Sequence, residues 1–289
     1  MSQSFESLES AIRSSVQRAL EEDLVPDGDL TAALVSPELV TSGTLTARQG
    51  GILAGSDCAT ETFRQIDTKI KMSWHRKDGD RFNSGDALAT LEGSLAKVLT
   101  AERTALNFLS HLSGIATVVA KWVEQAGDGA IIWDTRKTIP GLRAVEKAAV
   151  LAGGGANHRH NLSDWVMLKD NHLTGTTITD AVMLSRQKWP DRAVHVECDS
   201  FGQVQEALDA EADILLLDNM TPEEIKHCVS IVDKNTENGT KRPLLEASGG
   251  ITLDIVSNYS NTGVDYISSG VLTNSAPALD IGLDLINLG

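Results

Sequence analysis

The sequence has few cysteines, and they form no recognisable pair. Cys58, Cys198 and Cys228 are far apart, and no CxxC motif occurs. Secreted domains that depend on disulfides are rich in paired cysteines, and structural zinc sites use closely spaced ones. The sequence therefore predicts three reduced thiols in a reducing compartment, with neither a disulfide framework nor a cysteine-bound zinc ion.

An excess of basic residues is also missing. The 289 residues include 25 Lys and Arg against 40 Asp and Glu, for a formal net charge of −15. Nucleic acids and anionic membranes attract basic surfaces, so this composition argues against both as partners. No apolar run approaches the ~18 residues of a membrane-spanning helix. The first residues, MSQSFESLESAIRSSV, lack the apolar stretch of a secretory signal. We expect a soluble, cytoplasmic protein.

The first part of the chain changes from a helical to a strand-like pattern. Apolar residues at helical spacing predict a helix over 4–22. Between 43 and 92 short strands with Gly-Asp turns are expected, and they resemble the hammerhead barrels of biotinyl and lipoyl carriers. Such carriers display a modifiable lysine at a hairpin tip, and this part of the sequence has none there, so we interpret it as structural. A long helix over 97–125 then joins two halves and contains the domain boundary.

After residue 129, apolar runs alternate with helical segments, which is typical of buried parallel strands joined by helices. The six runs are AIIWDTRK, DWVMLKD, AVHVECD, DILLLDNM, PLLEASGG and VDYISSG. Each ends on charged or small polar residues, as in α/β barrels, where the carboxyl ends of the strands build the site. Because six strands are fewer than eight, we predict an incomplete α/β barrel. A doubly wound open sheet is the alternative architecture.

The segment 134–172 concentrates positive charge at these strand ends. It holds six of the 25 Lys and Arg but only four of the 40 Asp and Glu. If its two strands are neighbours, five side chains can converge on one pocket: Arg136, Lys137, His158, Arg159 and Lys169. Guanidinium groups bind carboxylates through two hydrogen bonds, and ammonium groups add point charges. The set predicts a small ligand with two or more negative groups. The alternative is that each cation pairs with a local carboxylate.

Glycines and acids follow the later strands. SGGIT (248–252) and SSG (268–270) resemble the loops that hold a phosphate on backbone N–H groups in barrels. Glu197 and Asp218 are candidates to bind ribose hydroxyls or a hydrated Mg²⁺. Together with the cations, these residues indicate a phosphorylated sugar that reacts with a multi-anionic partner.

Two further motifs are weaker. The run Gly153-Gly154-Gly155 follows a predicted helix, so one glycine can cap it and the others suggest close approach by a ligand or another segment. His158, His160 and His172 raise the alternative of a zinc site. His158 and His160 form an HxH pair, but no residue has a convincing spacing to serve as the third zinc ligand.

The sequence closely resembles quinolinate phosphoribosyltransferase over nearly its whole length. The matching motifs are ALEEDL, GDLT, AERTALNFLSHLSGIAT, DTRKTIPGLRAVEKAAVLAGGGANHR, VMLKDNH, LLLDNM, LEASGGI and GVDYISSGVLTNSAPALDI. The resemblance implies an N-terminal α/β sandwich domain over 1–115, with the tail 275–289 as a candidate to pack on it, and a catalytic barrel domain over 116–274. It further implies a homodimer with shared active sites. Its reaction, in de novo NAD biosynthesis, converts quinolinate and 5-phosphoribosyl-1-pyrophosphate (PRPP), with Mg²⁺ and no organic cofactor, to nicotinate mononucleotide, pyrophosphate and CO₂.

The resemblance also implies residue roles. The substrate-binding residues of the quinolinate pocket are Thr135, Arg136, Lys137, His158, Arg159 and Lys169, with Arg103 contributed by the neighbouring subunit. The catalytic residues are Lys137, Lys169, Glu197 and Asp218, and the two acids bind ribose and Mg²⁺, directly or through water. The phosphate-binding residues are Ser248, Gly249, Gly250, Ser269 and Gly270, beside Glu197 and Asp218 for the rest of PRPP.

One position departs from the family pattern, and three alternatives stay open. LTNS (272–275) has Asn274 where many bacterial members have histidine, and an amide cannot carry a proton near neutral pH. A paralogous branch associated with molybdenum transport shares the scaffold. A Schiff-base aldolase could use Lys137 or Lys169 at a strand end. A non-catalytic carrier or binding protein is the third alternative.

Overall fold

The chain folds as two compact units in a computed structural model that describes residues 7–237 and 241–288. The first unit comprises Met1–Ala120, Thr138–Gly154 and Val271–Gly289, and the second comprises Lys121–Lys137 and Gly155–Gly270. No helix in the described part of the chain is long and apolar enough to cross a lipid bilayer.

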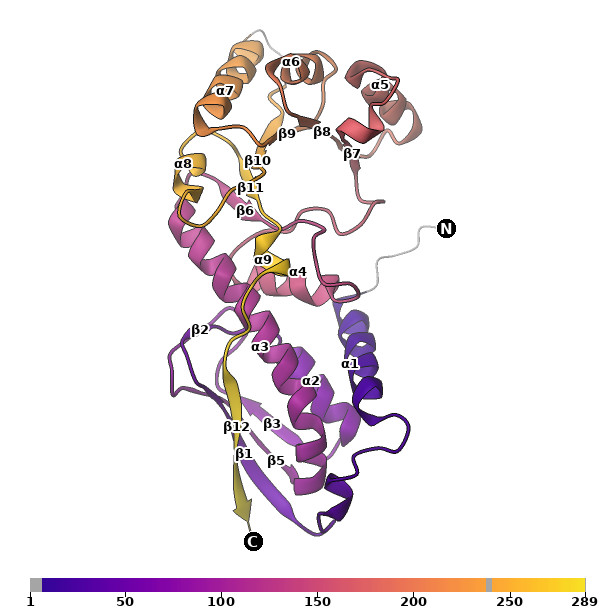
Figure 1. The fold of residues 1–289 in the computed structure, drawn as a ribbon, viewed down its shortest axis with the longest axis vertical. Helices are drawn as coiled ribbons and strands as arrows, with labels where there is room; N and C mark the ends of the chain where they lie inside the picture. The colour runs from indigo at the N-terminus through magenta and orange to yellow at the C-terminus, as the bar shows by residue number, and fades with distance from the viewer. Residues whose placement is uncertain (1–6, 238–240, 289) are drawn as a thin grey trace. The chain divides into compact units, whose positions relative to one another are not determined.

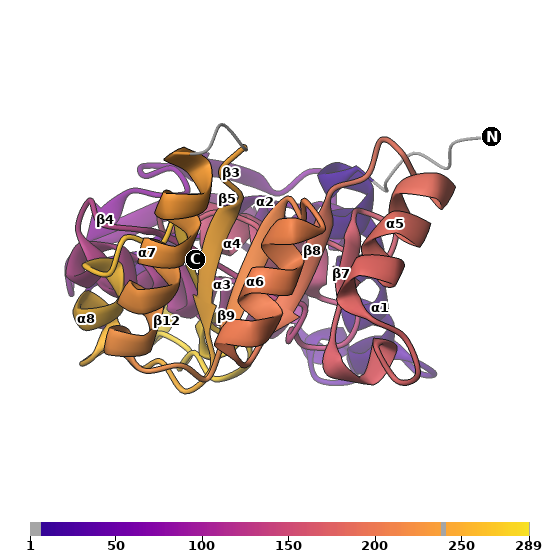
Figure 2. The same cartoon turned by 90° about the horizontal axis from the view of Figure 1, so that it is seen from above.

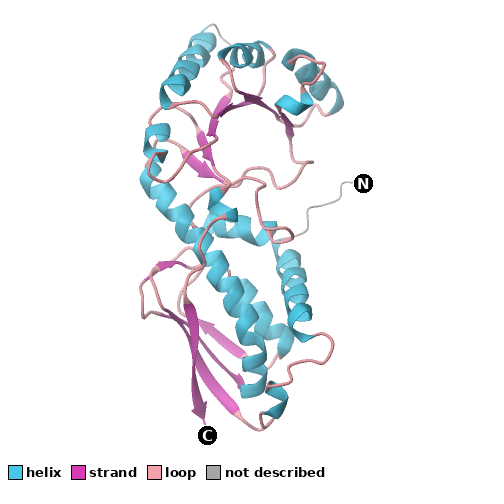
Figure 3. Cartoon of the chain, viewed as in Figure 1, coloured by secondary structure: helices cyan, strands magenta, loops and turns pink. Residues whose placement is uncertain are grey.

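A four-stranded antiparallel sheet with helices on it forms the first unit (Figure 3), in the strand order β12-β1-β5-β3. Buried residues alternate with partly exposed ones along β1, which gives the sheet one core face. Leu45 and Leu88 of that face pack with Phe63 and Leu109 of two helices. The strands are β1 (Val40–Ala47), β3 (Lys71–Trp74), β5 (Ala87–Ser94), β12 (Ile281–Leu288) and the separate pair β2 (Gly51–Ile52) and β4 (Arg81–Phe82).

The helices of the first unit match the prediction in two places and correct it in one. α1 (Leu8–Leu24) begins after Ser7, whose hydroxyl accepts a hydrogen bond from the nitrogen of Ser10, and the predicted start at 4–6 lies outside the described residues. α3 (Leu95–Ala126) is the predicted long helix and continues into the second unit. The expectation of strands and turns alone over 43–92 is wrong at α2 (Ser56–Ile66), because its buried residues recur at helical spacing. The other helices are η1 (Ala32–Leu34), α4 (Arg143–Ala152) and α9 (Val271–Asn274).

A six-stranded parallel sheet forms the second unit, in the order β6-β11-β10-β9-β8-β7 (Figure 1). All six predicted strands are present, and they confirm the predicted incomplete barrel. The strands are β6 (Ile131–Trp133), β7 (Val166–Leu168), β8 (Val194–Cys198), β9 (Ile214–Asp218), β10 (Leu244–Ser248) and β11 (Tyr266–Ser268). Helices α5 (Ile178–Lys188), α6 (Phe201–Asp209) and α7 (Pro222–Glu237) line the outer side of the sheet (Figure 2), and η2 (Asp170–His172) and α8 (Val256–Ser260) complete the unit.

The parallel register brings the carboxyl ends of the strands to one edge. Glu197 of β8 lies opposite Leu216 of β9, which lies opposite Glu246 of β10. β6 and β7 end before the basic residues that follow them in the sequence, so those side chains stand in the first residues of the loops. The fold thus places the predicted site residues of the barrel along one rim.

Two of the three consecutive glycines, Gly153 and Gly154, are explained by the first unit. Gly154 adopts a left-handed φ of +85°, as expected after a helix end. A Cβ atom on Gly153 would lie 2.5 Å from the carbonyl oxygen of Ala116 and 2.7 Å from Cβ of Val119, both on α3. The close approach that the glycines suggested is therefore made by another segment of the chain.

Candidate active site

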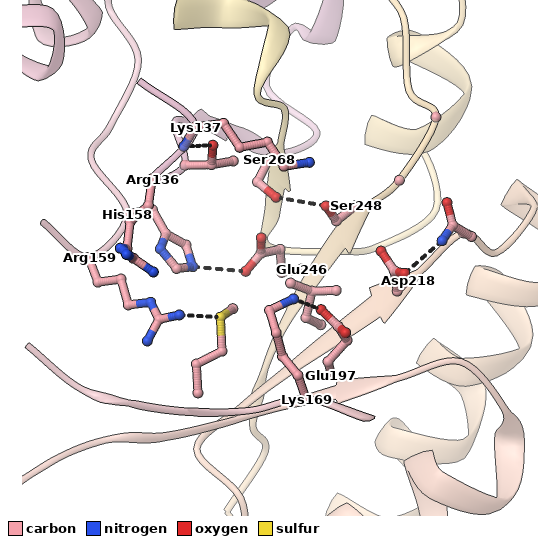
Figure 4. Close-up of a pocket in the computed structure, with 16 residues that line it drawn as sticks. Arg136, Lys137, His158, Arg159, Lys169, Glu197, Asp218, Glu246, Ser248 and Ser268 are labelled. Carbon is pink, nitrogen blue, oxygen red and sulfur yellow. Dashed lines mark hydrogen bonds and ion pairs between the residues drawn. The ribbon is translucent and has the colours of Figure 1, made fainter. Parts of the chain in front are cut away.

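A cavity of about 500 Å³ opens at the carboxyl ends of the barrel strands, and most of the predicted site residues line it (Figure 4). The predicted residues on its wall are Thr135, Arg136, Lys137, His158, Arg159, Lys169, Glu197, Asp218, Ser248, Gly249 and Gly250. One side of the wall is cationic, and the other carries carboxylates and a glycine loop.

Two motifs far apart in the sequence build the cationic side. The extended segment around Ala156 forms a parallel bridge to Trp133 at the end of β6. Beyond the bridge, the buried carboxylate of Asp134 accepts a hydrogen bond of 2.8 Å from the backbone nitrogen of His158. The stretch with Thr135 and Lys137 is held by a bond from the Lys137 nitrogen to the Thr135 hydroxyl, 2.9 Å long. These backbone contacts bring the DTRK and NHR motifs to one wall.

The cations of this wall are positioned for an anion. Arg159 is buried, and its guanidinium lies 3.1 Å from the sulfur of Met167. Burial and the neighbouring charge of Arg136 lower the pKa of Arg159. An anionic ligand that contacts both guanidinium groups would relieve this repulsion, so the arrangement favours one. Lys169 forms an ion pair with Glu197 at the end of the neighbouring strand β8.

Glu197 and Asp218 form the acidic side, at the ends of the neighbouring strands β8 and β9. Burial and the charge of Glu197 raise the pKa of Asp218, and the charges of Lys169 and Lys137 oppose this rise. Two carboxylates that repel each other at adjacent strand ends offer the oxygen ligands that a hard divalent cation prefers. The donor set therefore fits Mg²⁺.

The glycine loop after β10 is tightly packed against the loop after β9. Gly249 and Gly250 have left-handed φ angles of +90° and +64°. Asn219 is also left-handed, at +56°, and its side-chain nitrogen lies 2.6 Å from Asp218 Oδ2. A Cβ atom on Gly249 would lie 2.2 Å from Asn219 Oδ1, so only glycine fits. The predicted helix after this loop starts only at Val256 and has five residues, so its N-terminus does not adjoin the loop. The groups of the loop that could bind a phosphate are therefore its own backbone N–H groups.

Some predicted residues lie elsewhere. Ser269 and Gly270 are not among the residues that line the cavity. Gly270 nevertheless lies close to a lining residue, because a Cβ atom on it would lie 2.6 Å from Lys137 Cδ. Arg103 is exposed on α3 in the first unit. Asn274, at the end of α9 in the same unit, is exposed and accepts a hydrogen bond of 2.6 Å from Ser275.

The histidines do not assemble as the zinc alternative supposed. His160 and His172 are exposed, and Nδ1 of His172 accepts a hydrogen bond from the backbone nitrogen of Lys169. Within the described residues, the group with metal-compatible distances combines His158 with His195 and Glu246 instead.

The sequence prediction missed several residues at this site. The cavity-wall residues outside the predicted set are Met167, Leu216, Asn219, Glu246 and Ser268, of which Ser268 lies in the SSG run (268–270) that the sequence indicates. Nε2 of His195 lies 3.1 Å from Glu246, behind the wall. A signal for two of them was present, because histidine and glutamate inside the apolar runs VHVEC and LLEAS are unusual in buried strands. Ser268 shows why such residues matter, since its hydroxyl donates to Ser248 at 3.1 Å and links two strand ends.

Known proteins resemble this chain in sequence and in fold. The chain is 40% identical over 280 residues to the nicotinate-nucleotide pyrophosphorylase (carboxylating) of Mycobacterium leprae, covering 95% of this chain and 97% of that one. It is 37% identical over 295 residues to the chloroplastic enzyme of that name from Arabidopsis thaliana, covering 95% and 82%. The structure of the nicotinate-nucleotide pyrophosphorylase from Francisella tularensis superimposes with a TM-score of 0.90 at 35% identity, covering 97% and 98%.

The family models cover both parts of the chain. The model of the quinolinate phosphoribosyl transferase N-terminal domain matches residues 29–113, and the model of the C-terminal domain matches residues 115–284. The motifs, the six-stranded barrel and these matches lead to one conclusion: the chain belongs to the quinolinate phosphoribosyltransferase family.

Proposed function

We propose that this protein transfers a phosphoribosyl group from PRPP to quinolinate and releases CO₂, which yields nicotinate mononucleotide and pyrophosphate. The observation that supports it is one cavity with a cationic wall, an acidic wall and a glycine loop. Quinolinate needs the cations, ribose needs hydrogen-bond acceptors, and a phosphate needs backbone N–H groups. Family membership supports the same reaction.

The cationic wall holds quinolinate. Arg136, His158 and Arg159 bind the two adjacent carboxylates of the pyridine ring, with Thr135 beside them. Fixing the carboxylates turns the ring nitrogen, a weak nucleophile, towards the anomeric carbon of PRPP. Such positioning replaces a bimolecular encounter and can supply several kcal/mol of the barrier.

The opposite wall holds PRPP. The backbone of Ser248, Gly249 and Gly250, extended by Ser269 and Gly270, binds the 5-phosphate. Glu197 and Asp218 accept hydrogen bonds from the ribose hydroxyls and hold Mg²⁺, directly or through water. When bound, Mg²⁺ neutralises charge on the pyrophosphate oxygens.

The reaction then proceeds in two stages, transfer of the phosphoribosyl group followed by loss of CO₂. The nitrogen lone pair forms the bond to the anomeric carbon, and the bond to the pyrophosphate oxygen breaks with its electrons on that oxygen. Lys137 and Lys169 stabilise the leaving oxygens. The ring nitrogen is now cationic, so it stabilises the electron pair left on the ring carbon when the 2-carboxylate departs as CO₂. A proton on that carbon completes nicotinate mononucleotide.

We also propose the assembly and the location. The protein acts as a homodimer in which the exposed Arg103 of one copy reaches the quinolinate site of the other, and it works in the cytoplasm. Asn274 does not act as a proton carrier, since an amide does not ionise near neutral pH.

The deciding experiment incubates the purified chain with quinolinate labelled at the 2-carboxyl group, PRPP and Mg²⁺. We expect labelled CO₂, pyrophosphate and nicotinate mononucleotide in equal amounts, and none without PRPP. Nicotinate is the control substrate, because it lacks the carboxylate that leaves. Absence of PRPP-dependent CO₂ release overturns the proposal, and a borohydride-trapped adduct on Lys137 or Lys169 would support an aldolase instead.

A further inference from the structure

Two polar side chains occupy the interior of the barrel, where apolar residues are the rule. His195 on β8 has no exposed surface, and Glu246 on β10 is 1% exposed. Their closest atoms, His195 Nε2 and Glu246 Oε2, are 3.1 Å apart. Nε2 of His158 approaches the same oxygen at 3.7 Å (Figure 4), and the centroids of the two imidazole rings are 5.6 Å apart. Three buried groups therefore form a compact cluster, in which His158 and Glu246 line the cavity and His195 lies behind them.

A carboxylate in this position needs a counterpart. An unpaired buried charge is strongly unfavourable, and two imidazole groups face Glu246 to compensate its charge. Burial alone would raise the pKa of Glu246, but the two histidines hold it well below its usual range. The carboxylate thus keeps its charge and attracts the nearest ring edge of His158.

The remaining sides of His158 are also held. Its ring makes edge-to-face contacts with Trp133 and Trp165, with centroids 4.8 and 5.0 Å apart. Its backbone nitrogen is fixed by Asp134. The aromatic contacts restrict tilting of the ring, and Glu246 is the group that selects which edge points inwards. His158 then presents a defined surface to the cavity.

We propose that Glu246 is a positioning residue for quinolinate, which acts through His158 and is itself held in place by His195. This rests on the proposed function, because His158 lies on the wall assigned to the pyridine carboxylates. Glu246 has no assigned contact with the phosphoribosyl half, so its removal should weaken quinolinate binding selectively.

The same three side chains have the composition of a metal site, with ligand atoms within 4.8 Å of one another. Two observations favour positioning. A histidine that binds a metal nearly always donates its other ring N–H, and among the described residues Nδ1 of His195 has no hydrogen-bond partner. The contact of His195 Nε2 with Glu246 is an ion-pair approach at 3.1 Å without hydrogen-bond geometry. A divalent ion would also add charge beside Arg136 and Arg159, which already repel each other.

The test is a double-mutant cycle between Glu246 and His158. Glu246→Gln keeps the shape of the side chain and removes its charge, and His158→Gln removes the imidazole. We expect each to raise KM for quinolinate about 10-fold and to leave KM for PRPP within about twofold. The double variant should be no more than about threefold worse than the worse single variant, because both act through one contact.

His195→Gln and His227→Gln are the matched companions. His195→Gln should show a smaller rise in the same KM, since it loosens Glu246 without touching the cavity. His227 is exposed on α7, so its variant should behave as wild type. Calorimetric binding of quinolinate to each folded variant repeats the cycle without catalysis.

Four results would overturn the proposal. The first is a KM for quinolinate that rises near 100-fold in the double variant, as independent effects would give. The second is an equal change in the KM values for quinolinate and PRPP, and the third is an unchanged KM for quinolinate in Glu246→Gln. The fourth is a stoichiometric metal ion in wild type that is lost in Glu246→Gln and His195→Gln. If wild type lacks PRPP-dependent CO₂ release, the proposed function fails separately, and the calorimetric cycle still decides the role of Glu246 in binding.

Discussion

The backbone nitrogen of His158 lies 2.8 Å from a carboxylate oxygen of Asp134, and Asp134 has no exposed surface. This bond connects the loop after β6 to a segment 24 residues later, and it places the NHR motif beside the DTRK motif. The cationic wall of the cavity depends on it.

Asp134→Ala tests this connection. Loss of a buried charged acceptor leaves the His158 N–H without its partner, so we expect the free energy of unfolding to fall by about 2 kcal/mol. KM for quinolinate should rise as well. Urea unfolding and steady-state kinetics measure the two effects. Asp67→Ala is the control, because Asp67 also accepts from a backbone nitrogen but in an exposed turn. Equal losses in both variants would contradict the special role of Asp134.

Arg136→Ala and Arg159→Ala test the quinolinate side of the cavity. Each variant removes a cation whose charged hydrogen bonds are worth roughly 1.5–3 kcal/mol, so KM for quinolinate should rise about 10- to 100-fold. KM for PRPP should change much less. Arg64 pairs with Glu61 on the surface of α2, and Arg64→Ala should leave both constants unchanged. Unaltered kinetics in both cavity variants would remove these arginines from the site.

Gly249→Ala tests the glycine loop. The new methyl group would meet Asn219 Oδ1 at 2.2 Å and would also occupy a left-handed backbone. Gly175 provides the matched control, since its φ is +81° and nothing lies within 4 Å of an added Cβ atom. The free energy of unfolding of both variants should fall by roughly 1–2 kcal/mol because of backbone strain. Only Gly249→Ala should raise KM for PRPP, by more than about 10-fold. An equal KM in the two variants would show that the clash does not reach the phosphate site.

Asp218→Asn should stabilise the fold while it removes activity. The pKa of Asp218 is raised, so its native state binds protons more tightly than its unfolded state does, and its ionisation destabilises the fold as the pH rises above 3.8. The unfolding temperature of the variant should therefore exceed that of wild type at pH 7 to 8, and the gap should narrow as the pH falls towards 3.8. Mg²⁺ should raise the unfolding temperature of wild type more than that of the variant. A less stable variant at pH 8 would reverse the sign of this argument.

Patterns in the sequence predicted the barrel because each buried strand is a short apolar run between polar segments. They predicted the strand-end residues for the same reason, since Lys169 and Asp218 terminate such runs. Glu246 was missed because a strand pattern gives the face of a residue and not the partner that compensates its charge. Asn219 was missed because its left-handed backbone depends on the neighbouring glycine loop, which no local pattern encodes. The partner of Lys169 was missed because Glu197 is 28 residues away and meets it only through the register of β7 and β8.

The last prediction concerns the proposed sharing of sites between two copies. Arg103→Ala and Lys169→Ala should each abolish most activity in a pure dimer. In a mixed dimer, the copy with intact Lys169 receives intact Arg103 from its partner, so one of the two sites is restored. Equal mixing after dissociation and reassociation gives half mixed dimers, and about a quarter of wild-type activity should return. Mixing Arg136→Ala with Lys169→Ala is the control, because both residues serve the cavity of their own copy and each mixed site lacks one of them. Recovery in the control would show that Arg136 and Lys169 do not serve the same copy. No recovery with Arg103→Ala, in dimers verified as mixed by mass, would place Arg103 in its own copy's function.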